Sequence, residues 1–482
     1  MKSDKKIFAR LALTGGSLLI AAAAPGQTSA AGAPPPSAGL LNDYLREQST
    51  AMNAWDIGGQ MRVRFESRSG FAVAGAGASA VDFNRLTPDN NYWLLREKFH
   101  VGYQPASWAD FYAEGRDSSS WNDKRTPEPE EDSIDLHQAF IGLGNAKEFP
   151  VTAKVGRQEL SYGDERLVGA FDWSNLGRVF DAAKLRFEND TLWVDAFAGR
   201  VVLANDGGFN VANDYDWFSG VYASTKELIP KQETQLYFLA RNTDAKSPAA
   251  TTGSPQAGGP TARDIYTVGL RFKSLSGQFG GWDYDAELAG QFGNYYEPSL
   301  TNNLDHQAFA VHVAGGYTWT KTKGSPRLGL EYNFASGDSN ATDGKHGTFE
   351  NLFPTNHKFY GYMDFVSWQN IHNVRLASSL KPVKGLTLTA DYHLFWLAET
   401  ADYFYAVSGA ARKTGGYGIK PANGSFAGSE LDLIATYAIR AYASAQIGYG
   451  HFFTGDYVKN SLAGTGGAKG ADYIYAQLTF NF

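Results

Sequence analysis

The chain has 482 residues, 43% of them hydrophobic, and a formal net charge of −7 at pH 7. It contains no Cys, which excludes disulfides, thiolate metal sites, cysteine nucleophiles and an acylated lipoprotein N-terminus. The negative charge and the lack of a basic patch with interleaved aromatics argue against nucleic-acid binding, so we expect no nucleic-acid partner.

The first thirty residues have the pattern of a secretory signal peptide. A basic region, Lys2, Lys5, Lys6 and Arg10, precedes the apolar run "LALTGGSLLIAAAA", and small residues follow. The apolar run is shorter than the roughly 20 residues that span a bilayer, so a transmembrane anchor fits less well. We predict a signal peptide over 1–30, with cleavage between 24 and 33. Removing its four cations and one anion takes the formal net charge from −7 to −10.

After a Pro-led periplasmic linker over 31–53, the chain has strand character from 54 to 482. In "GQMRVRFES", Met61, Val63 and Phe65 alternate with polar residues, which is the period of a strand with two unlike faces. The alternation recurs in "GWDYDAELAGQF", "QAFAVHVAGGYTWT", "RLGLEYNF" and the closing "ADYIYAQLTFNF". About eighteen such segments have roughly the 9–11 residues of a tilted strand that crosses a bilayer.

Long and short connections alternate between these segments. Long ones lie near 67–90, 117–133, 159–178, 201–215, 242–262, 294–306, 335–368, 397–428 and 453–470, and short ones near 104–108, 145–150, 188–190, 226–232, 274–280, 321–326, 381–385 and 440–442. A meander through an outer membrane has this alternation, whereas a soluble sandwich does not require it. The sequence therefore predicts an all-β, transmembrane antiparallel β-barrel of about 18 strands in the bacterial outer membrane, with long extracellular loops and short periplasmic turns.

The last strand ends on an aromatic residue, Phe482. In a closed barrel this strand pairs with the first strand, which removes the edge of the sheet. A terminal Phe resembles the C-terminal signal that the barrel-insertion machinery recognises. We therefore expect this machinery and outer-membrane lipid as partners.

If the apolar faces meet lipid, the opposite faces line a lumen. Arginines dominate the inward positions of the first ten predicted strands, and carboxylates gather later. One interpretation is a path for anions, because guanidinium groups bind planar carboxylates through two hydrogen bonds and stay charged. The other is that arginines and carboxylates pair across the wall and stiffen the barrel.

The densest cluster of charges is "VGRQELSYGDERLVGAFDWSNLGRVFDAAKLRF", residues 155–187, a strand, a polar loop and a returning strand. The loop is either a gate that folds inward or an ordinary solvated loop. The segment resembles the alginate export family of outer-membrane barrels, whose members carry a Gly-Arg-Gln strand end and a returning Arg-x-Phe-Asp. The matching residues here are Gly156, Arg157 and Gln158, and Arg178, Phe180 and Asp181.

The resemblance is specific over roughly residues 90–200 and compatible with the whole mature chain. It implies a barrel of about eighteen strands, passage of an anionic polysaccharide through a positively lined pore, and periplasmic export partners. The residues expected along this path are Arg62, Arg64, Arg96, Lys98, Arg157, Glu159, Arg166, Arg178, Asp181, Lys184, Arg186 and Arg271.

The sequence thus predicts an anion-selective channel for passive passage of a uronate-type polysaccharide or oligosaccharide. The alternatives are a general porin for small solutes and an outer-membrane barrel hydrolase. The histidines occur singly, and no metal-ligand spacing or nucleophile motif is present. His393 and His451 are the histidines to consider for a hydrolase, but wall histidines usually only form hydrogen bonds. We expect no enzymatic activity, no catalytic residue, no cofactor and no metal site.

Overall fold

A computed structural model of the chain describes residues 39–77, 80–244, 262–297 and 302–482. The predicted signal peptide and the first part of the predicted linker lie outside these residues. Helix α2 (Leu40–Gln48) and the 3-10 helix η1 (Thr50–Ala54) precede the first strand, β1 (Trp55–Ser69). No helix in the described part of the chain is long and apolar enough to cross a membrane.

The remaining described residues fold almost entirely into strands joined by turns and loops. The strands are β2 (Asn90–Ala106), β3 (Ala109–Trp121), β4 (Asp132–Leu143), β5 (Val151–Gln158), β6 (Phe180–Glu188), β7 (Leu192–Leu203), β8 (Val211–Thr225), β9 (Gln232–Thr243), β10 (Arg263–Ser274), β11 (Trp282–Glu297), β12 (Asn302–Thr318), β13 (Arg327–Ala335), β14 (Lys345–His346), β15 (Ile371–Leu380), β16 (Leu386–Leu397), β17 (Phe426–Arg440), β18 (Ala443–Thr454) and β19 (Ala471–Asn481). The short helices are η3 (Asn356–Lys358), η4 (Pro421–Asn423) and α3 (Asp456–Leu462).

Strand pairing closes the sheet into a barrel. Each wall strand pairs antiparallel with the next, and β19 pairs with β1. The two-residue β14 lies in a loop, where it pairs parallel with β12, while β13 pairs directly with β15. Of the nineteen described strands, eighteen therefore form the wall, which confirms the predicted fold class.

The closing contact involves the last residue of the chain. The amide of Phe482 donates to the carbonyl of Gly59 at 2.9 Å, and the Gly59 amide donates back at 3.0 Å. A Cβ on Gly59 would come within 2.5 Å of the Phe482 ring, so only glycine leaves room for that ring. The predicted pairing of the last strand with the first is confirmed by this register, which runs from Gln60 and Asn481 to Ser69 and Asp472.

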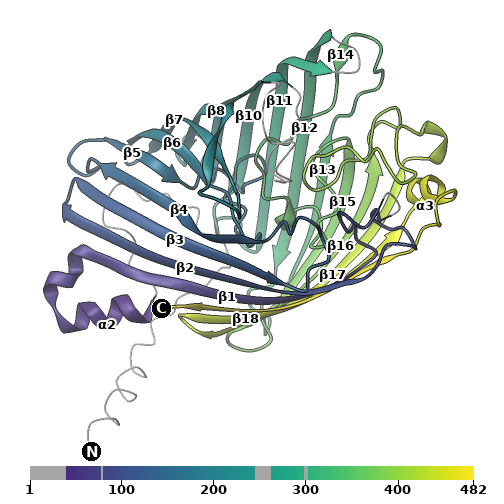
Figure 1. Cartoon of the computed structure of the whole chain (residues 1–482). Coiled ribbons are helices and arrows are strands. Elements are labelled where there is room, and N and C mark those ends of the chain that lie inside the picture. Colours follow the sequence, from purple (N-terminus) through teal and green to yellow (C-terminus); the bar gives the residue numbers. More distant parts are fainter. Residues whose placement is uncertain (1–38, 78–79, 245–261, 298–301) are drawn as a thin grey trace, which may run out of the picture.

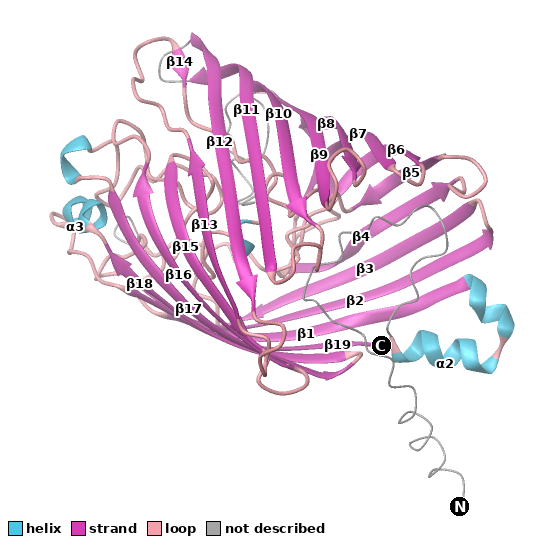
Figure 2. Cartoon of the chain, turned by 180° about the vertical axis from the view of Figure 1, so that it is seen from behind, coloured by secondary structure: helices cyan, strands magenta, loops and turns pink. Residues whose placement is uncertain are grey.

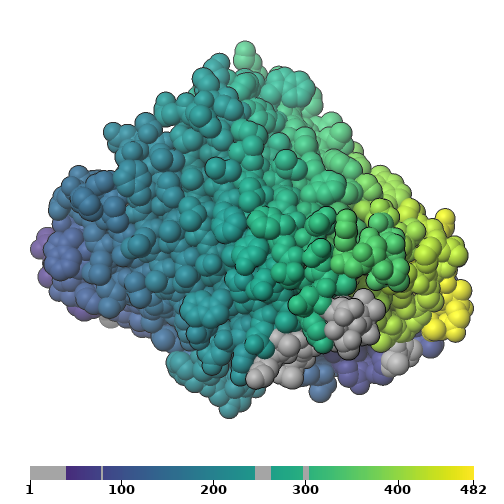
Figure 3. Space-filling view, turned by 90° about the horizontal axis from the view of Figure 1, so that it is seen from above, coloured from purple at the N-terminus to yellow at the C-terminus, as the bar shows by residue number. Residues whose placement is uncertain are grey.

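The alternation of side chains produces two unlike faces. Leu330 on β13 is 61% exposed on the outside, while its neighbour Glu331 is buried on the inside. The pleat produces this alternation along the wall strands, because successive side chains point to opposite faces. Figure 3 shows the outer wall over the middle of the chain, coloured teal and green, as a continuous surface.

Helix α2 and the C-terminus lie at one end of the barrel, and β14 and α3 lie at the other (Figure 1). The short turns join strands at the first end and the long loops at the second. In outer-membrane barrels the short turns are periplasmic and the long loops are extracellular. One predicted long loop differs, because β11 and β12 continue to Glu297 and from Asn302 and leave only 298–301 between them.

Two long connections fold into the barrel instead of lying above it. Buried apolar side chains from 159–179 and 336–370, among them Leu160, Val168, Phe353 and Trp368, join one cluster with inward side chains of the wall. Val168 and Phe353 form a parallel bridge, so the two connections meet inside the lumen. Figure 2 shows loop segments, in pink, inside the ring of strands.

Candidate functional site

The lumen of the barrel, with the two connections folded into it, is the candidate functional site. We call residues 159–179, between β5 and β6, the first lumen loop, and residues 336–370, between β13 and β15, the second lumen loop. An inward fold was one of two expectations for the first loop. The inward fold of the second loop was not predicted, although its aromatic content, from Phe349 to Trp368, was a signal for burial.

Arginines of β1 and β2 hold the backbone of the first lumen loop. Arg62 donates to the carbonyls of Asp172 and Ser174 at 2.7 and 2.9 Å. Arg96 donates to the same two carbonyls at 2.9 and 3.2 Å and forms an ion pair with the Asp172 carboxylate at 2.9 Å. Both side chains are buried. These cations therefore bind the loop in this structure.

Arg64 belongs to the same anchor. It donates to the Trp173 carbonyl at 2.8 Å, and its guanidinium lies 4.1 Å from the centroid of the Trp173 ring. Its Nε atom also lies 2.7 Å from Glu66. Three consecutive loop residues, 172–174, are thus fixed by three arginines of two adjacent strands.

Lys98 faces a group of carboxylates beside this anchor. Its Nζ atom lies 3.7 Å from Glu114, 3.9 Å from Glu159 and 3.7 Å from Asp172. The Asp172 side chain is 58% exposed, so this side of the loop meets solvent. Burial raises the pKa of Asp172, but the charges of Arg96, Lys98 and Arg62 outweigh burial and hold that pKa below its ordinary value. Burial raises the pKa of Glu159.

The opposite wall holds the first lumen loop through Arg166. This arginine donates to Glu331 at 2.8 Å and to Asn333 at 3.2 Å, and its guanidinium lies 4.0 Å from the Phe359 ring centroid. Burial opposes its charge, yet Glu331 outweighs burial and raises the pKa of Arg166. The loop is therefore tied to β13 as well as to β1 and β2.

Lys184, Arg186 and Arg271 also face inward and are paired with carboxylates. Arg186 donates twice to Asp195, at 2.5 and 2.9 Å, and Lys184 lies 3.4 Å from the same carboxylate. Arg271 lies 2.7 Å from Asp164 of the first lumen loop and donates to Asp285. Pairing across the wall, one of the two interpretations drawn from the sequence, thus occurs at each of these positions.

Arg157 and Asp181 lie on the outward-facing sides of β5 and β6, which corrects their expected position in the lumen; Arg157 is buried there and also donates to the carbonyls of Leu136 and Asn210. Arg157 shares its face of β5 with Val155, which is 53% exposed, and Asp181 shares its face of β6 with Leu185, which is 56% exposed. Arg157 donates to both oxygens of Asp181, at 2.8 and 3.0 Å. The spacing Val155–Arg157 already contained this signal, because residues two apart on a strand face the same side.

Arg178, like Arg62, binds backbone carbonyls and forms no ion pair with a carboxylate of the described residues. Its Nη1 atom donates to the carbonyls of Gly169, Phe353 and Pro354, at 2.9, 2.5 and 2.9 Å, and so joins the two lumen loops. Within the described residues no carboxylate lies within 4.0 Å of it, and its Nε atom is buried without a partner. Burial and the nearby Arg241 guanidinium lower the pKa of Arg178 to about 9, and Glu165 opposes the shift.

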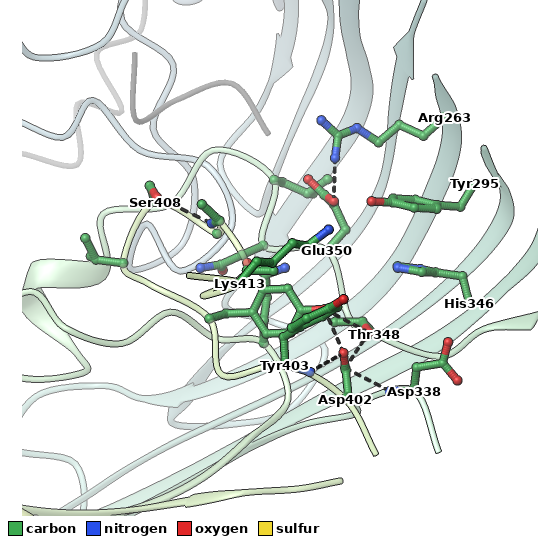
Figure 4. Close-up of a pocket in the computed structure, with 18 of the residues that line it drawn as sticks. Arg263, Tyr295, Asp338, His346, Thr348, Glu350, Asp402, Tyr403, Ser408 and Lys413 are labelled. Atoms are coloured by element: carbon green, nitrogen blue, oxygen red, sulfur yellow. Dashed lines mark hydrogen bonds and ion pairs between the residues drawn. The ribbon is translucent and has the colours of Figure 1, made fainter. Parts of the chain in front are cut away.

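Arg178 lies in the wall of a cavity of about 590 Å³ at the long-loop end of the lumen. The second lumen loop, the connection 398–425 and the long-loop ends of β9, β10, β11 and β12 supply the other walls. Glu350 accepts hydrogen bonds from Arg241 at 2.9 Å and from Arg263 at 2.8 Å. Figure 4 shows Arg263 and Glu350 pointing toward one another. The cavity thus joins guanidinium groups from three elements.

The rest of the cavity wall is aromatic and hydroxylic. The rings of Tyr295 and His346 stack with centroids 3.7 Å apart. Asp402 accepts hydrogen bonds from the Thr348 hydroxyl at 2.6 Å and from the Tyr405 hydroxyl at 2.9 Å. Flat rings beside charged and hydroxyl groups can stack on a sugar ring and bind its carboxylate and hydroxyls.

The two histidines considered for a hydrolase lie in different places. His393 is buried in the wall, 3.3 Å from the Asn373 amide. His451 lies 2.7 Å from Asp472, and Tyr449 also donates to that carboxylate. In the part of the chain that the structure describes, neither histidine forms a hydrogen bond with a serine.

A closed wall of eighteen antiparallel strands, with loops folded into a charged lumen, defines a transmembrane β-barrel of the outer-membrane type. The family profile described as Alginate export matches residues 54–471, so the chain belongs to the alginate export family. The predicted family, fold and outer-membrane location are thereby confirmed. No curated protein sequence matches the chain.

Solved structures with a similar fold include two porin-like barrels. The crystal structure of Pseudomonas aeruginosa OpdK with vanillate has a TM-score of 0.54 and 12% identity, and the match covers 89% of this chain and 98% of that chain. Acinetobacter baumannii OccAB1 has a TM-score of 0.54 and 10% identity, with 89% of this chain and 97% of that chain covered. At this identity the likeness concerns the fold alone.

Proposed function

We propose that this barrel is a passive channel for an anionic, uronate-type polysaccharide or its oligosaccharides. The family supports a transport channel, and the chemistry of the lumen supports the charge of the solute. Of the residues expected along the path, Arg157 and Asp181 are left out because they face outward. The others remain part of the proposal, as do periplasmic partners that deliver the polymer and the insertion machinery that reads the strand ending at Phe482.

The observation that carries the proposal is the state of Arg178. One nitrogen of its guanidinium holds three loop carbonyls, while Nε and Nη2 make no hydrogen bond to any described residue. This pair of nitrogens is the edge that binds a carboxylate through two hydrogen bonds. Arg241 and Arg263 both bind Glu350 nearby, and Arg241 is also paired with Asp216 at 2.7 Å. The cavity therefore favours a carboxylate of the solute.

On the side of the lumen loops away from the cavity, the lumen carries both positive and negative side chains. Lys273 is 44% exposed and lies 2.9 Å from Asp164, and the exposed carboxylate of Asp172 faces Lys98. A channel has to bind its solute strongly enough to admit it and weakly enough to release it. Carboxylates beside the cations prevent a polyanion from binding too tightly, so that a channel can release it.

The proposal is tested by single-channel reversal potentials in a planar bilayer under a KCl gradient, with and without polyuronate. We expect anion selectivity and block by polyuronate in the wild type. Arg178→Gln is expected to weaken the block about tenfold, the effect of losing one charge-assisted contact of roughly 1.4 kcal/mol. Arg157→Gln is the matched control, because it removes the other arginine of the family motif from the outer face. Cation selectivity, or indifference to polyuronate, would overturn the proposal.

A second candidate is a channel for small carboxylates. One similar structure was solved with vanillate, an aromatic carboxylate, and the cavity of about 590 Å³ holds a ligand of that size. The same bilayer experiment separates the two candidates. Block by vanillate without block by polyuronate favours the small solute, and block by polyuronate favours the polymer.

A further inference from the structure

Two neighbouring turns at the short-turn end of the barrel carry lysines and no carboxylate. They are 319–326, between β12 and β13, and 381–385, between β15 and β16. Their four lysines, Lys321, Lys323, Lys381 and Lys384, are exposed, and we call them the lysine cluster. The turns touch, because the amide of Lys381 donates to the carbonyl of Gly324 at 2.8 Å. Four positive charges therefore share one part of the rim.

This charge pattern differs from that of other turns at the same end. The turn 226–231, between β8 and β9, has Glu227 beside its two lysines, and the turn 144–150 has Glu148 next to Lys147. Within the described residues, none of the four lysines of the cluster forms an ion pair. The cluster therefore presents unneutralised positive charge at the level of the periplasmic headgroups.

An apolar groove of about 730 Å³ lies on the outer face of the barrel next to the lysine cluster. It crosses β13, β15, β16, β17 and β18, and its large side chains include Leu328, Leu380, Leu388, Leu433 and Ile447. Small residues, Ser378, Ala390 and Ala435, line it between them. Because small side chains lie between large ones, they leave a furrow in the outer face of the barrel, where the neighbouring side chains are bulky.

The groove begins at the turns that carry the lysines. Trp319 and Pro326 of the first turn and Leu380, next to Lys381, line it. Trp319 is 44% exposed, and tryptophan is enriched where a membrane protein passes from hydrocarbon to headgroups. The site is therefore amphipathic along its length, with positive charge at the interface and an apolar furrow in the hydrocarbon.

We propose that the lysine cluster and the groove together bind an anionic phospholipid of the periplasmic leaflet. The phosphate of the headgroup lies among the lysine ammonium groups, and an acyl chain fills the groove. Lysines at a membrane surface attract anionic lipid, and an acyl chain gains contacts in a furrow that a flat wall does not offer. A polysaccharide fits this surface less well, because it has no apolar segment for the groove.

Native mass spectrometry of the purified full-length mature barrel tests the site, with dioleoylphosphatidylglycerol and dioleoylphosphatidylcholine as probes. We expect the wild type to retain the anionic lipid preferentially. Replacing all four lysines of the cluster with Gln is expected to lower this retention by about tenfold or more, with phosphatidylcholine unchanged. Lys226→Gln with Lys231→Gln, in the mixed turn, is the matched control and is expected to retain the lipid.

The groove has its own test. Ala390→Leu with Ala435→Leu fills the furrow and is expected to lower the retention of both lipids. Heat-modifiable migration in gels verifies that each variant is folded, and Lys381→Gln with Lys384→Gln replaces the fourfold variant if that one does not fold. Equal retention of the two lipids by the wild type overturns the proposal. So does a lysine variant that keeps the lipid but loses block by polyuronate, because the cluster then serves the polymer.

Discussion

Removing the two arginines that hold the first lumen loop is expected to release the loop from the wall and to change the conductance of the channel. Arg62→Ala with Arg96→Ala deletes the hydrogen bonds to the Asp172 and Ser174 carbonyls and the ion pair to the Asp172 carboxylate. Hydrogen bonds from a charged donor contribute roughly 1.5–3 kcal/mol each. Because both arginines donate to the same two carbonyls and water reaches Asp172, the individual contributions do not add, and we expect a cost of about 3 kcal/mol for the pair.

A cost of about 3 kcal/mol shifts the equilibrium between the anchored and released loop by a factor of about 10². Single-channel recordings in a planar bilayer are expected to show larger mean conductance and more frequent switching between levels. Arg200→Ala is the matched control, because Arg200 pairs with Asp214 and lies 4.3 Å from the Trp217 ring, away from the loop. Conductance and switching equal to wild type in the double variant would refute the role assigned to this anchor.

Three further predictions follow from individual contacts. Asp172→Asn is expected to lower the free energy of unfolding at pH 7 by about 1 kcal/mol or less, because the side chain is exposed. Since the pKa of Asp172 is depressed in the folded protein, the difference in stability from the wild type is expected to shrink as the pH falls below roughly 4. Thermal melts at pH 7 and pH 3 check this. Gly59→Leu is expected to disrupt closure against Phe482 and reduce the heat-resistant folded form in gels, whereas Gly290→Ala, with no atom within 4 Å of the added Cβ, should not. Arg157→Gln is expected to lower the melting temperature without shifting the reversal potential. A shifted reversal potential would indicate that Arg157 lies along the path of the solute.

The sequence predicted the wall of the barrel because the evidence for a strand is local. In "RLGLEYNF" the pleat alone assigns Leu330 to the lipid and Glu331 to the lumen, and the structure agrees. The alternation of connection lengths predicted the two ends in the same way. Arg178 and Phe180 lie where the first lumen loop returns into β6, as the sequence order predicted.

Only the tertiary structure decided which partner each charged side chain contacts. Arg62 and Arg96 contact carbonyls about eighty to one hundred and ten positions away in sequence, and Arg178 contacts Phe353 across the lumen. Such partners depend on where the lumen loops settle, and burial of their aromatic side chains in a common cluster decides that position. The side of the wall on which a side chain lies was fixed by the local pleat, but its partner was fixed by the packing of distant segments.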